Sequence, residues 1–353
     1  MTHLDFSKNW IILAELSVWE AAAELALYIG LLREKAGLGQ ERPQINDAET
    51  ALPNSAPIII LKAAAGDPAR NGFSWRVGID RVEISGDSLR GLWNGIFDFL
   101  AALGITWPAP EQEVLPQAVE AAFNLKEDKA FCPSVSSVRD RRRLFIGEKT
   151  GAKEREKLVK WAARNKYDAL VFSLREKFLW NRAKRVARIY GAERYALALE
   201  AGGSDLSLLL PRRLFLLHRD LFRMESGKRK TERHFCPTNP ETISRIREQA
   251  GKLFHRALPG MTAQKVFHLL PDQGHENTWC ACPACRAFNS AEQNIIAVNS
   301  AADTLADLDP QALLSFYDFG IAPHEPGASG IAPRKNTFQL TELSPSAGQQ
   351  NQS

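Results

Sequence analysis

The sequence predicts an α/β protein built from two parts. A small α+β domain with the element order β-α-β-β-α precedes a (β/α) TIM-like barrel that is incomplete, with about five strand-helix units. Three observations support this prediction. The length of 353 residues exceeds what one hydrophobic core usually organises. A hydrophobic content of 44% excludes a largely disordered chain. From Cys132 onward, apolar strands alternate with charged helical segments.

The elements of the first domain follow from changes in hydrophobic period. Residues 10–13 form a short apolar run, and the helical spacing after them ends at Gly37, which predicts a strand and a helix capped by Ser17. The continuous apolar run IIILK is typical of a buried strand. The segments FSWRVGIDRVEISG and SLRGLWNGIFDFLAALG then predict a hairpin and a second helix. We expect this domain to span residues 1–120.

The barrel domain is expected over residues 130–345, with a polar tail at 346–353. Its apolar runs predict strands near residues 138–146, 169–172, 195–199, 265–270 and 313–317. Residues 337–343 could add one further strand. A complete barrel has eight strands or so, so the pocket is expected to be open, completed by a partner chain such as a second copy, or part of a fragment.

Five stretches of sequence resemble known families. Residues 72–116, with Ser-Leu-Arg-Gly at a helix start and Gly-Ile-Thr-Trp in a strand, resemble the domain that precedes the barrel in α-glucuronidases and bacterial β-hexosaminidases. The later stretches resemble an uncharacterised bacterial family of glycoside-hydrolase-like barrels: WAARNKYDALVF, LEAGGSDLSLLLPRRLF, and HLLPDQGHENTWCACPACRAF together with Phe-Cys-Pro-Thr-Asn-Pro. This resemblance implies a glycosidase-like barrel and leaves the substrate open.

Carboxylates that follow predicted strands are the candidate catalytic groups. A glycosidase needs one carboxyl group to protonate the leaving oxygen and another to act as nucleophile or to activate water. We expect Asp272 or Glu276 to be the acid and Glu200 or Asp318 to be its partner, because barrels carry chemistry at the carboxyl ends of strands. The alternatives are a helix cap for Asp272 and, for Glu200, a buried ion pair with Arg164 or Arg142.

Several other side chains are candidates for binding the sugar. Trp279 offers a flat apolar face, and the Ala-Gly-Gly after Glu200 would let the backbone approach a ligand closely. The basic runs at 139–145 and 227–235 could bind an acidic sugar such as a uronic acid, although most such runs are solvated. The complete candidate set for substrate binding is His275, Trp279, Arg142, Arg164, Asn165, Asn239 and Tyr317.

Three of the five cysteines form the motif Cys280-x-Cys282-x-x-Cys285. Their thiolates lie close enough in sequence to bind one soft divalent ion, most naturally zinc. Cys236, His234 or His275 could supply the fourth ligand. Four protein ligands would indicate a structural zinc, and three would indicate a catalytic one. The alternatives are reduced thiols that pack a loop, or a disulfide.

Net charge and the N-terminal segment limit the classes of partner and the location that we expect. The net charge of +4 is the small difference between 45 basic and 41 acidic side chains, so it indicates neither nucleic acid nor an anionic membrane as a partner. No secretory signal is recognisable, and we expect a cytoplasmic protein that binds a carbohydrate and requires no cofactor. The alternatives are a non-catalytic carbohydrate-binding relative and a zinc-stabilised nucleic-acid-binding protein.

Overall fold

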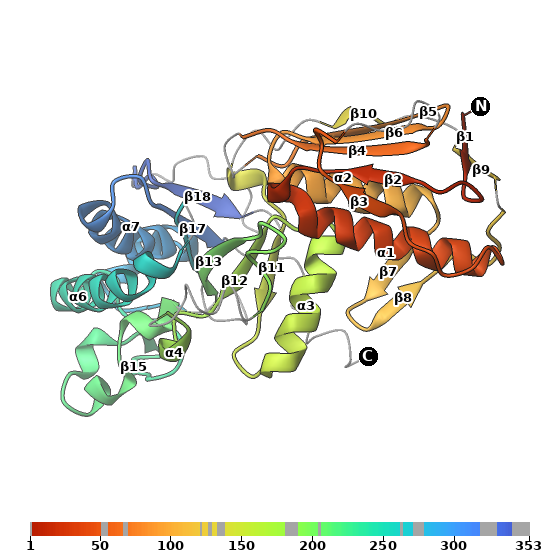
Figure 1. Ribbon diagram of the computed structural model, residues 1–353. Helices are drawn as coiled ribbons and strands as arrows, with labels where there is room; N and C mark the ends of the chain where they lie inside the picture. Colours follow the sequence, from red (N-terminus) through yellow and green to blue (C-terminus); the bar gives the residue numbers. More distant parts are fainter. Residues whose placement is uncertain are drawn as a thin grey trace. The chain divides into compact units, whose positions relative to one another are not determined.

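The computed structural model describes residues 2–50, 56–65, 70–120, 122–125, 129–132, 138–180, 190–203, 206–261, 264–270, 279–317 and 330–340. The chain divides into two compact units, whose elements are labelled in Figure 1. Unit 1 consists of Met1–Arg142, Gly151–Asp168 and Arg188–Ala198, and unit 2 consists of Arg143–Thr150, Ala169–Ala187 and Leu199–Ser353. Unit 1 therefore contains more of the chain than residues 1–120.

Unit 1 is built on a mixed six-stranded sheet in the order β10-β5-β6-β4-β2-β3. The four strands from β6 to β3 run parallel, and β5 and β10 are antiparallel to their neighbours. Two further pairs, β1 with β9 and β7 with β8, are antiparallel. The bounds are β1 Thr2–Asp5, β2 Ile11–Leu13, β3 Gln44–Asn46, β4 Ile58–Ala63, β5 Phe73–Gly78, β6 Arg81–Gly86, β7 Thr106–Ala109, β8 Gln112–Val114, β9 Ala122–Leu125 and β10 Lys129–Cys132.

Among the described residues, three helices belong to unit 1: α1 (Trp19–Lys35), α2 (Leu89–Ala102) and α3 (Ala152–Arg164). The predicted cap Ser17 does not cap α1, because a 3-10 turn at Leu16–Val18 leads directly into the helix. Ser88 does cap α2, where its hydroxyl accepts a hydrogen bond of 3.0 Å from the Gly91 N–H. A side chain therefore satisfies an amide that the helix itself leaves unpaired.

Helix α2 lies at the centre of unit 1, in contact with β4, β5 and β6 and with α1 and α3. Trp93 is fully buried there and stacks on Phe97. Arg90, also buried, donates hydrogen bonds to the carbonyl oxygens of Ala163 (3.1 Å) and Tyr195 (3.2 Å), and burial lowers its pKa to about 10. These bonds explain why α3 and the segment before β13 belong to unit 1.

Unit 2 is built on six parallel strands in the order β11-β12-β13-β16-β17-β18. All five predicted strands are present, and the segment proposed as an extra strand supplies the sixth. Within the described residues the order is open, because β11 and β18 are not paired. The bounds are β11 Arg143–Ile146, β12 Ala169–Phe172, β13 Ala198–Gly203, β16 Val266–Leu269, β17 Leu313–Tyr317 and β18 Thr337–Leu340.

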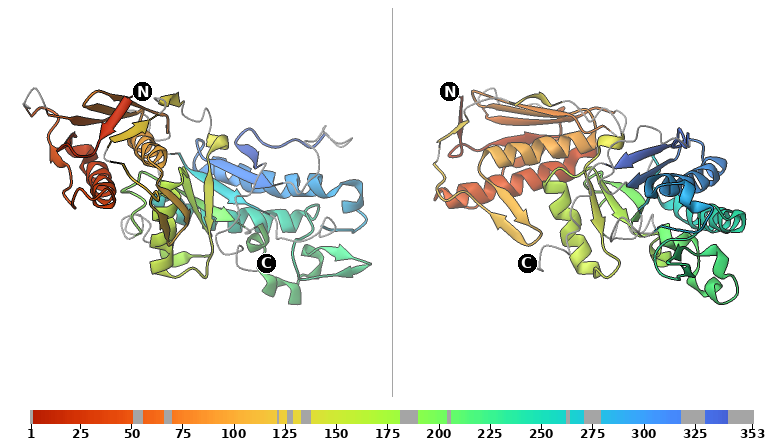
Figure 2. Two further views of the ribbon diagram at one scale, coloured as in Figure 1. Left: turned by 90° about the vertical axis from the view of Figure 1, so that its right-hand side faces the viewer. Right: turned by 180° about the vertical axis from the view of Figure 1, so that it is seen from behind.

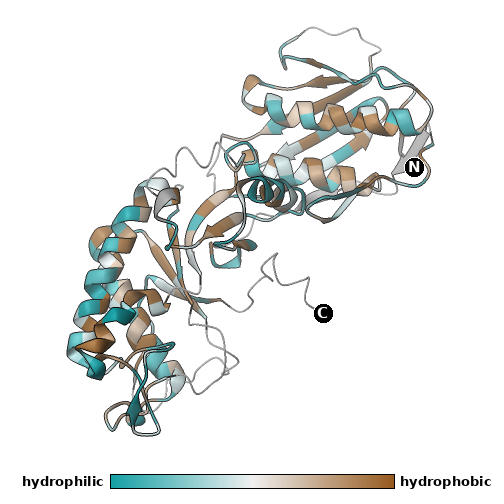
Figure 3. Cartoon of the chain, turned by 90° about the horizontal axis from the view of Figure 1, so that it is seen from below, coloured by the Kyte–Doolittle hydropathy of each residue, from teal (hydrophilic) through white to brown (hydrophobic). Residues whose placement is uncertain are grey.

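Two long helices of unit 2, α6 (Pro240–Ala257) and α7 (Ser290–Leu308), contact each other along their length (Figure 2). Both alternate between apolar and polar residues, whereas the strands are mainly apolar (Figure 3). The short helix α4 (Lys177–Trp180) follows β12, and a short hairpin of β14 (Met224–Glu225) and β15 (Lys228–Arg229) precedes α6. Among the described helices, none has the length and apolar character needed to cross a membrane.

Candidate active site and four-cysteine cluster

The two best candidate acids follow neighbouring strands of unit 2. Strand β16 ends at Leu269 and β17 ends at Tyr317, and the two strands pair in parallel. Asp272 comes three positions after the first strand end, and Asp318 immediately follows the second. Neighbouring parallel strands end at the same edge of a sheet, which is where α/β folds bind their ligands. The side chains of the candidates in these two segments lie outside the described residues: Asp272, His275, Glu276 and Asp318.

Glu200 lies on β13 in the interior of unit 2 and is fully buried. Its Oε2 accepts hydrogen bonds from Nε of Arg143 at 2.6 Å and from Nε2 of His268 at 2.8 Å. The other ring nitrogen of His268, Nδ1, lies 2.5 Å from the hydroxyl oxygen of Ser315. These side chains come from β11, β13, β16 and β17, so one polar network crosses the sheet.

The protonation of this network follows from its burial. Desolvation lowers the pKa of His268, and the Glu200 carboxylate only partly opposes that effect. A neutral His268 can donate from Nε2 to Glu200 and accept at Nδ1 from Ser315, which satisfies both ring nitrogens. Arg143 then provides the positive charge that compensates the buried carboxylate.

The alternative of a buried carboxylate paired with an arginine is confirmed for Glu200, whereas its expected exposure and the named arginine partners were wrong. The carboxylate is not exposed at the edge of the sheet, because β13 continues to Gly203 and places Glu200 inside the strand. Its arginine partner is Arg143 and not Arg164 or Arg142. The adjacent Gly202 has φ of +132°, and a Cβ atom there would lie 1.9 Å from the carbonyl oxygen of His268. This glycine therefore allows the neighbouring strand β16 to approach closely. From the sequence, a ligand was expected to approach here.

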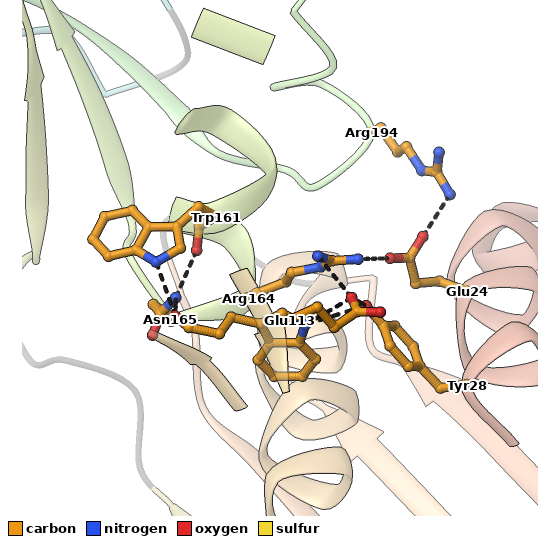
Figure 4. Close-up of polar contacts among 8 residues, drawn as sticks. Glu24, Tyr28, Glu113, Trp161, Arg164, Asn165 and Arg194 are labelled. Atoms are coloured by element: carbon orange, nitrogen blue, oxygen red, sulfur yellow. Dashed lines mark hydrogen bonds and ion pairs between the residues drawn. The ribbon is translucent and has the colours of Figure 1, made fainter. Parts of the chain in front are cut away.

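Arg164 and Asn165, two predicted sugar-binding residues, are engaged within unit 1 (Figure 4). Arg164 pairs with Glu24 at 3.3 Å and with Glu113 at 3.1 Å. Asn165 donates to the carbonyl oxygen of Trp107 at 3.1 Å. Both side chains thus attach the end of α3 to other elements of unit 1, which accounts for their polarity without a ligand.

The hydroxyl of Tyr28 completes this polar cluster, since it donates to Glu113 at 2.5 Å. The pKa of Tyr28 is raised well above its usual range by burial and by the bond to Glu113. The Glu24 carboxylate also receives a second guanidinium, that of Arg194 at 3.1 Å. The buried Glu24 and the partly exposed Glu113 are therefore balanced by two arginines from different segments of unit 1.

The basic run at 139–145 is only partly solvated, because Arg142 is exposed and its two neighbours are not. Arg141 and Arg143 are buried, and Arg142 lies over the ring of Tyr167 and donates to the carbonyl oxygen of Asn165 at 2.7 Å. Arg141 and Arg143 are therefore used inside the protein, whereas Arg142 makes its contacts at the surface.

Three further candidates have structural partners. Asn239 is the cap of α6, where its Oδ1 accepts hydrogen bonds from the N–H groups of Glu241 and Thr242. Trp279 does not offer an open face, because its indole stacks on His234 at a centroid distance of 4.2 Å. Tyr317 ends β17 half-buried, and its carbonyl oxygen accepts a bond from Asn294.

Four cysteines meet in unit 2: Cys236, Cys280, Cys282 and Cys285. Their Sγ atoms all lie within 4.8 Å of one another, and all four side chains are buried. Cys236 lies 3.7 Å from Cys282 and 3.6 Å from Cys285, sulphur to sulphur. The thiols are free. Hydrogen bonding from Cys280 lowers the pKa of Cys236, and the same contact raises the pKa of Cys280 to about 11.

The network around Glu200 was only partly foreseen from sequence. His268 interrupts the apolar strand Val266–Leu269, and Ser315 interrupts Leu313–Tyr317 in the same way. A polar residue inside a continuous apolar run signals a buried polar partner. The partnership itself depends on the register that aligns His268 with Ser315, which the sequence does not reveal.

Solved structures of sugar-cleaving enzymes share this architecture. The GH20 β-N-acetylhexosaminidase of Streptomyces coelicolor matches with a TM-score of 0.54 and 12% sequence identity, covering 96% of this chain and 66% of that one. The N-acetyl-β-hexosaminidase of Streptomyces plicatus matches with a TM-score of 0.52 and 14% identity, covering 95% and 64%. The fold is glycoside-hydrolase-like. The chain spans a little under two thirds of the length of these enzymes, and no protein-family model or curated protein matches its sequence.

Proposed function

We propose that this glycoside-hydrolase-like protein binds a carbohydrate at the edge of unit 2 where β16 and β17 end, and hydrolyses a glycosidic bond there. The observation that carries the proposal is the adjacency of these two strands in a fold similar to that of β-hexosaminidases, with a carboxylate close after each strand. Asp272 or Glu276 is the proposed acid, and Asp318 is the proposed partner.

The strand spacing suits two-carboxylate chemistry. Neighbouring strands lie about 4.8 Å apart, so carboxylates that follow adjacent strand ends start from a separation close to the shortest that glycosidases use. Retaining enzymes hold their carboxyl groups about 5 to 5.5 Å apart and inverting enzymes about 6.5 to 9.5 Å. Glu200 has no place in this pair, because Arg143 and His268 hold its carboxylate in the interior. We assign it the role of organising the sheet beneath the site.

The first substrate class to test is a β-linked N-acetylhexosaminide. The solved structures that resemble this chain include the Streptomyces plicatus enzyme in complex with Thio-NAglucal and a Vibrio harveyi exo-β-N-acetylglucosaminidase in complex with N-acetylglucosamine, the latter with a TM-score of 0.50 and 13% identity. A uronic acid is a weaker candidate, because the arginines proposed to bind it are engaged elsewhere, as Arg164 is with Glu24.

Hydrolysis of a panel of chromogenic aryl glycosides by the full chain tests the proposal. We expect turnover of at least one β-N-acetylhexosaminide, and a loss of about 10²-fold or more in Asp272→Asn or Glu276→Gln and in Asp318→Asn. Asp307→Asn is the matched control, because Asp307 is exposed on α7 away from the strand ends. Equal activity in all variants would contradict the proposal. Glycan binding without turnover would favour the alternative, a non-catalytic carbohydrate-binding relative.

A further inference from the structure

We propose that Cys236, Cys280, Cys282 and Cys285 form a structural zinc site. The proposal goes beyond the glycosidase function and does not depend on it. Zinc binds cysteine thiolates tetrahedrally with Zn–S bonds of about 2.3 Å, so the sulphur atoms of a four-cysteine site lie about 3.8 Å apart. The separations of 3.7 Å and 3.6 Å from Cys236 to Cys282 and Cys285 match this spacing. A disulfide would require a distance of about 2.05 Å.

Groups around the sulphur atoms suit a site that carries negative charge. The Met224 N–H donates to Sγ of Cys280 at 3.2 Å, and a guanidinium nitrogen of Arg229 lies 3.8 Å from the same atom. The hydroxyl of Thr238 lies 3.1 Å from Sγ of Cys285. Four thiolates and one zinc ion carry a net charge of two negative units, and hydrogen-bond donors that surround metal-bound sulphur stabilise such a charge.

Gln293 on α7 holds the motif in place from the other side. Its Oε1 accepts the Cys280 N–H at 3.0 Å, and its Nε2 donates to the carbonyl oxygens of Cys280 (3.1 Å) and Phe288 (3.2 Å). Gln293 is itself buried. The backbone that presents three of the four sulphur atoms is therefore preorganised by a side chain that does not bind the metal.

The position of the site explains what the zinc would stabilise. Cys236 comes three residues before Asn239, the cap of α6, and Cys285 comes four residues before Asn289, the cap of α7. Between residues 206 and 239, all of which the structure describes, the segment before α6 contains only short 3-10 helices and a hairpin of two two-residue strands. Small irregular regions bury little apolar surface and are commonly stabilised by a metal. The zinc would fasten the starts of two packed helices together.

Burial of all four ligands assigns the zinc a structural role. Cys285 is fully buried, and the other three cysteines are at most 5% exposed. Catalytic zinc sites keep a position open for water or substrate, whereas four-cysteine sites are closed. His234 was an alternative fourth ligand in the sequence, but its ring stacks on Trp279 and it is not part of the cluster.

Metal analysis of the purified full chain, expressed with zinc in the medium, tests the proposal. We expect one zinc per chain in the wild type and in Cys132→Ser, whose position lies on β10 in unit 1. We expect loss of zinc in Cys236→Ser and Cys282→Ser. Zinc-free wild-type protein, or full zinc content in these two variants, would overturn the proposal, as would iron in place of zinc.

X-ray absorption at the zinc edge of the wild type keeps the proposal testable even if the serine variants do not fold. Four sulphur neighbours at about 2.3 Å are expected. A shell that contains nitrogen or oxygen neighbours would contradict the four-cysteine assignment. Because these measurements use no sugar, they can fail while the glycosidase proposal holds, and the reverse is equally true.

Discussion

Removal of the Glu200 carboxylate is expected to destabilise unit 2 strongly. The carboxylate accepts bonds from Arg143 at 2.6 Å and from His268 at 2.8 Å, and all three side chains are buried. In Glu200→Ala the guanidinium of Arg143 would be left without this partner in the interior. Breaking a buried ion pair in this way costs about 3–5 kcal/mol. A typical domain has a free energy of unfolding of about 5–15 kcal/mol, so this variant should be close to unfolding.

The variant Glu200→Gln removes the negative charge of this side chain and keeps its volume. The amide retains the size and one acceptor oxygen, so we expect a loss of about 1.5–3 kcal/mol, the range for one hydrogen bond to a charged group. The double variant Arg143→Met with Glu200→Leu removes both charges and should be more stable than Glu200→Ala. Glu248→Gln is the control, because Glu248 pairs with Lys252 on the exposed surface of α6 and should change little.

The measurement is urea denaturation followed by circular dichroism, with hydrogen exchange to locate the change. In Glu200→Ala, backbone amides should first lose their protection from hydrogen exchange in β11, β13 and β16, the strands that carry Arg143, Glu200 and His268. The reasoning would be refuted if Glu200→Ala unfolded within about 1 kcal/mol of the wild type, because that is the size of an ordinary surface effect.

Three further predictions rest on single residues. Gly202→Ala should fail to fold or lose more than about 4 kcal/mol of unfolding free energy, because its Cβ would lie 1.9 Å from the His268 carbonyl oxygen. Gly203→Ala is the control: it shares a positive φ, but its Cβ would have no atom within 4 Å, so it should lose much less stability. Equal losses by thermal denaturation would contradict the clash. Since burial lowers the pKa of His268, the unfolded state takes up a proton below about pH 6.5 that the folded state does not. Stability should therefore fall as the pH falls, by up to about 1.4 kcal/mol per unit between pH 6.5 and 5 from this histidine. His268→Gln should remove this part of the slope and leave the part due to buried His234, whose pKa burial lowers to about 3, whereas the exposed His255→Gln should change neither. Arg164→Met should destabilise unit 1 by about 1.5–3 kcal/mol, the range for a hydrogen bond to a charged group, because Glu24 keeps Arg194 as a partner and Glu113 is partly exposed. It should have no selective effect on acidic glycans, and a selective loss of uronide binding on a glycan array would argue against this assignment.

Buried strands were the features that the sequence predicted best. Ala169–Phe172 and Leu313–Tyr317 match the predicted bounds, because a continuous apolar run is required wherever both faces of a strand are buried. The start of β11 was placed too early. The residues before it, Val138–Asp140, form a 3-10 turn.

The environment of Glu200 shows how a small boundary error changes a functional interpretation. The predicted strand ended at residue 199, which made Glu200 the first residue beyond it. The observed strand ends at Gly203 and places the carboxylate within the sheet. Small residues such as Ala201 and Gly202 weaken the apolar signal that would have extended the strand.

The fourth sulphur of the cysteine cluster shows what only tertiary structure can provide. The spacing of Cys280, Cys282 and Cys285 is local, and the sequence predicted their grouping. Cys236 was one of several candidate partners, because its approach depends on the packing of α6 against α7. Sequence periodicity describes each helix separately and does not determine which helix ends meet.

The most direct test of the proposed function is hydrolysis of an aryl β-N-acetylhexosaminide by the full chain and by Asp318→Asn. The account predicts measurable turnover in the wild type and a loss of about 10²-fold or more in the variant, with unchanged activity in Asp307→Asn. Turnover that survives Asp318→Asn would contradict the assignment of the acid pair. If the folded full chain neither hydrolysed nor bound any glycan, the carbohydrate function itself would be contradicted.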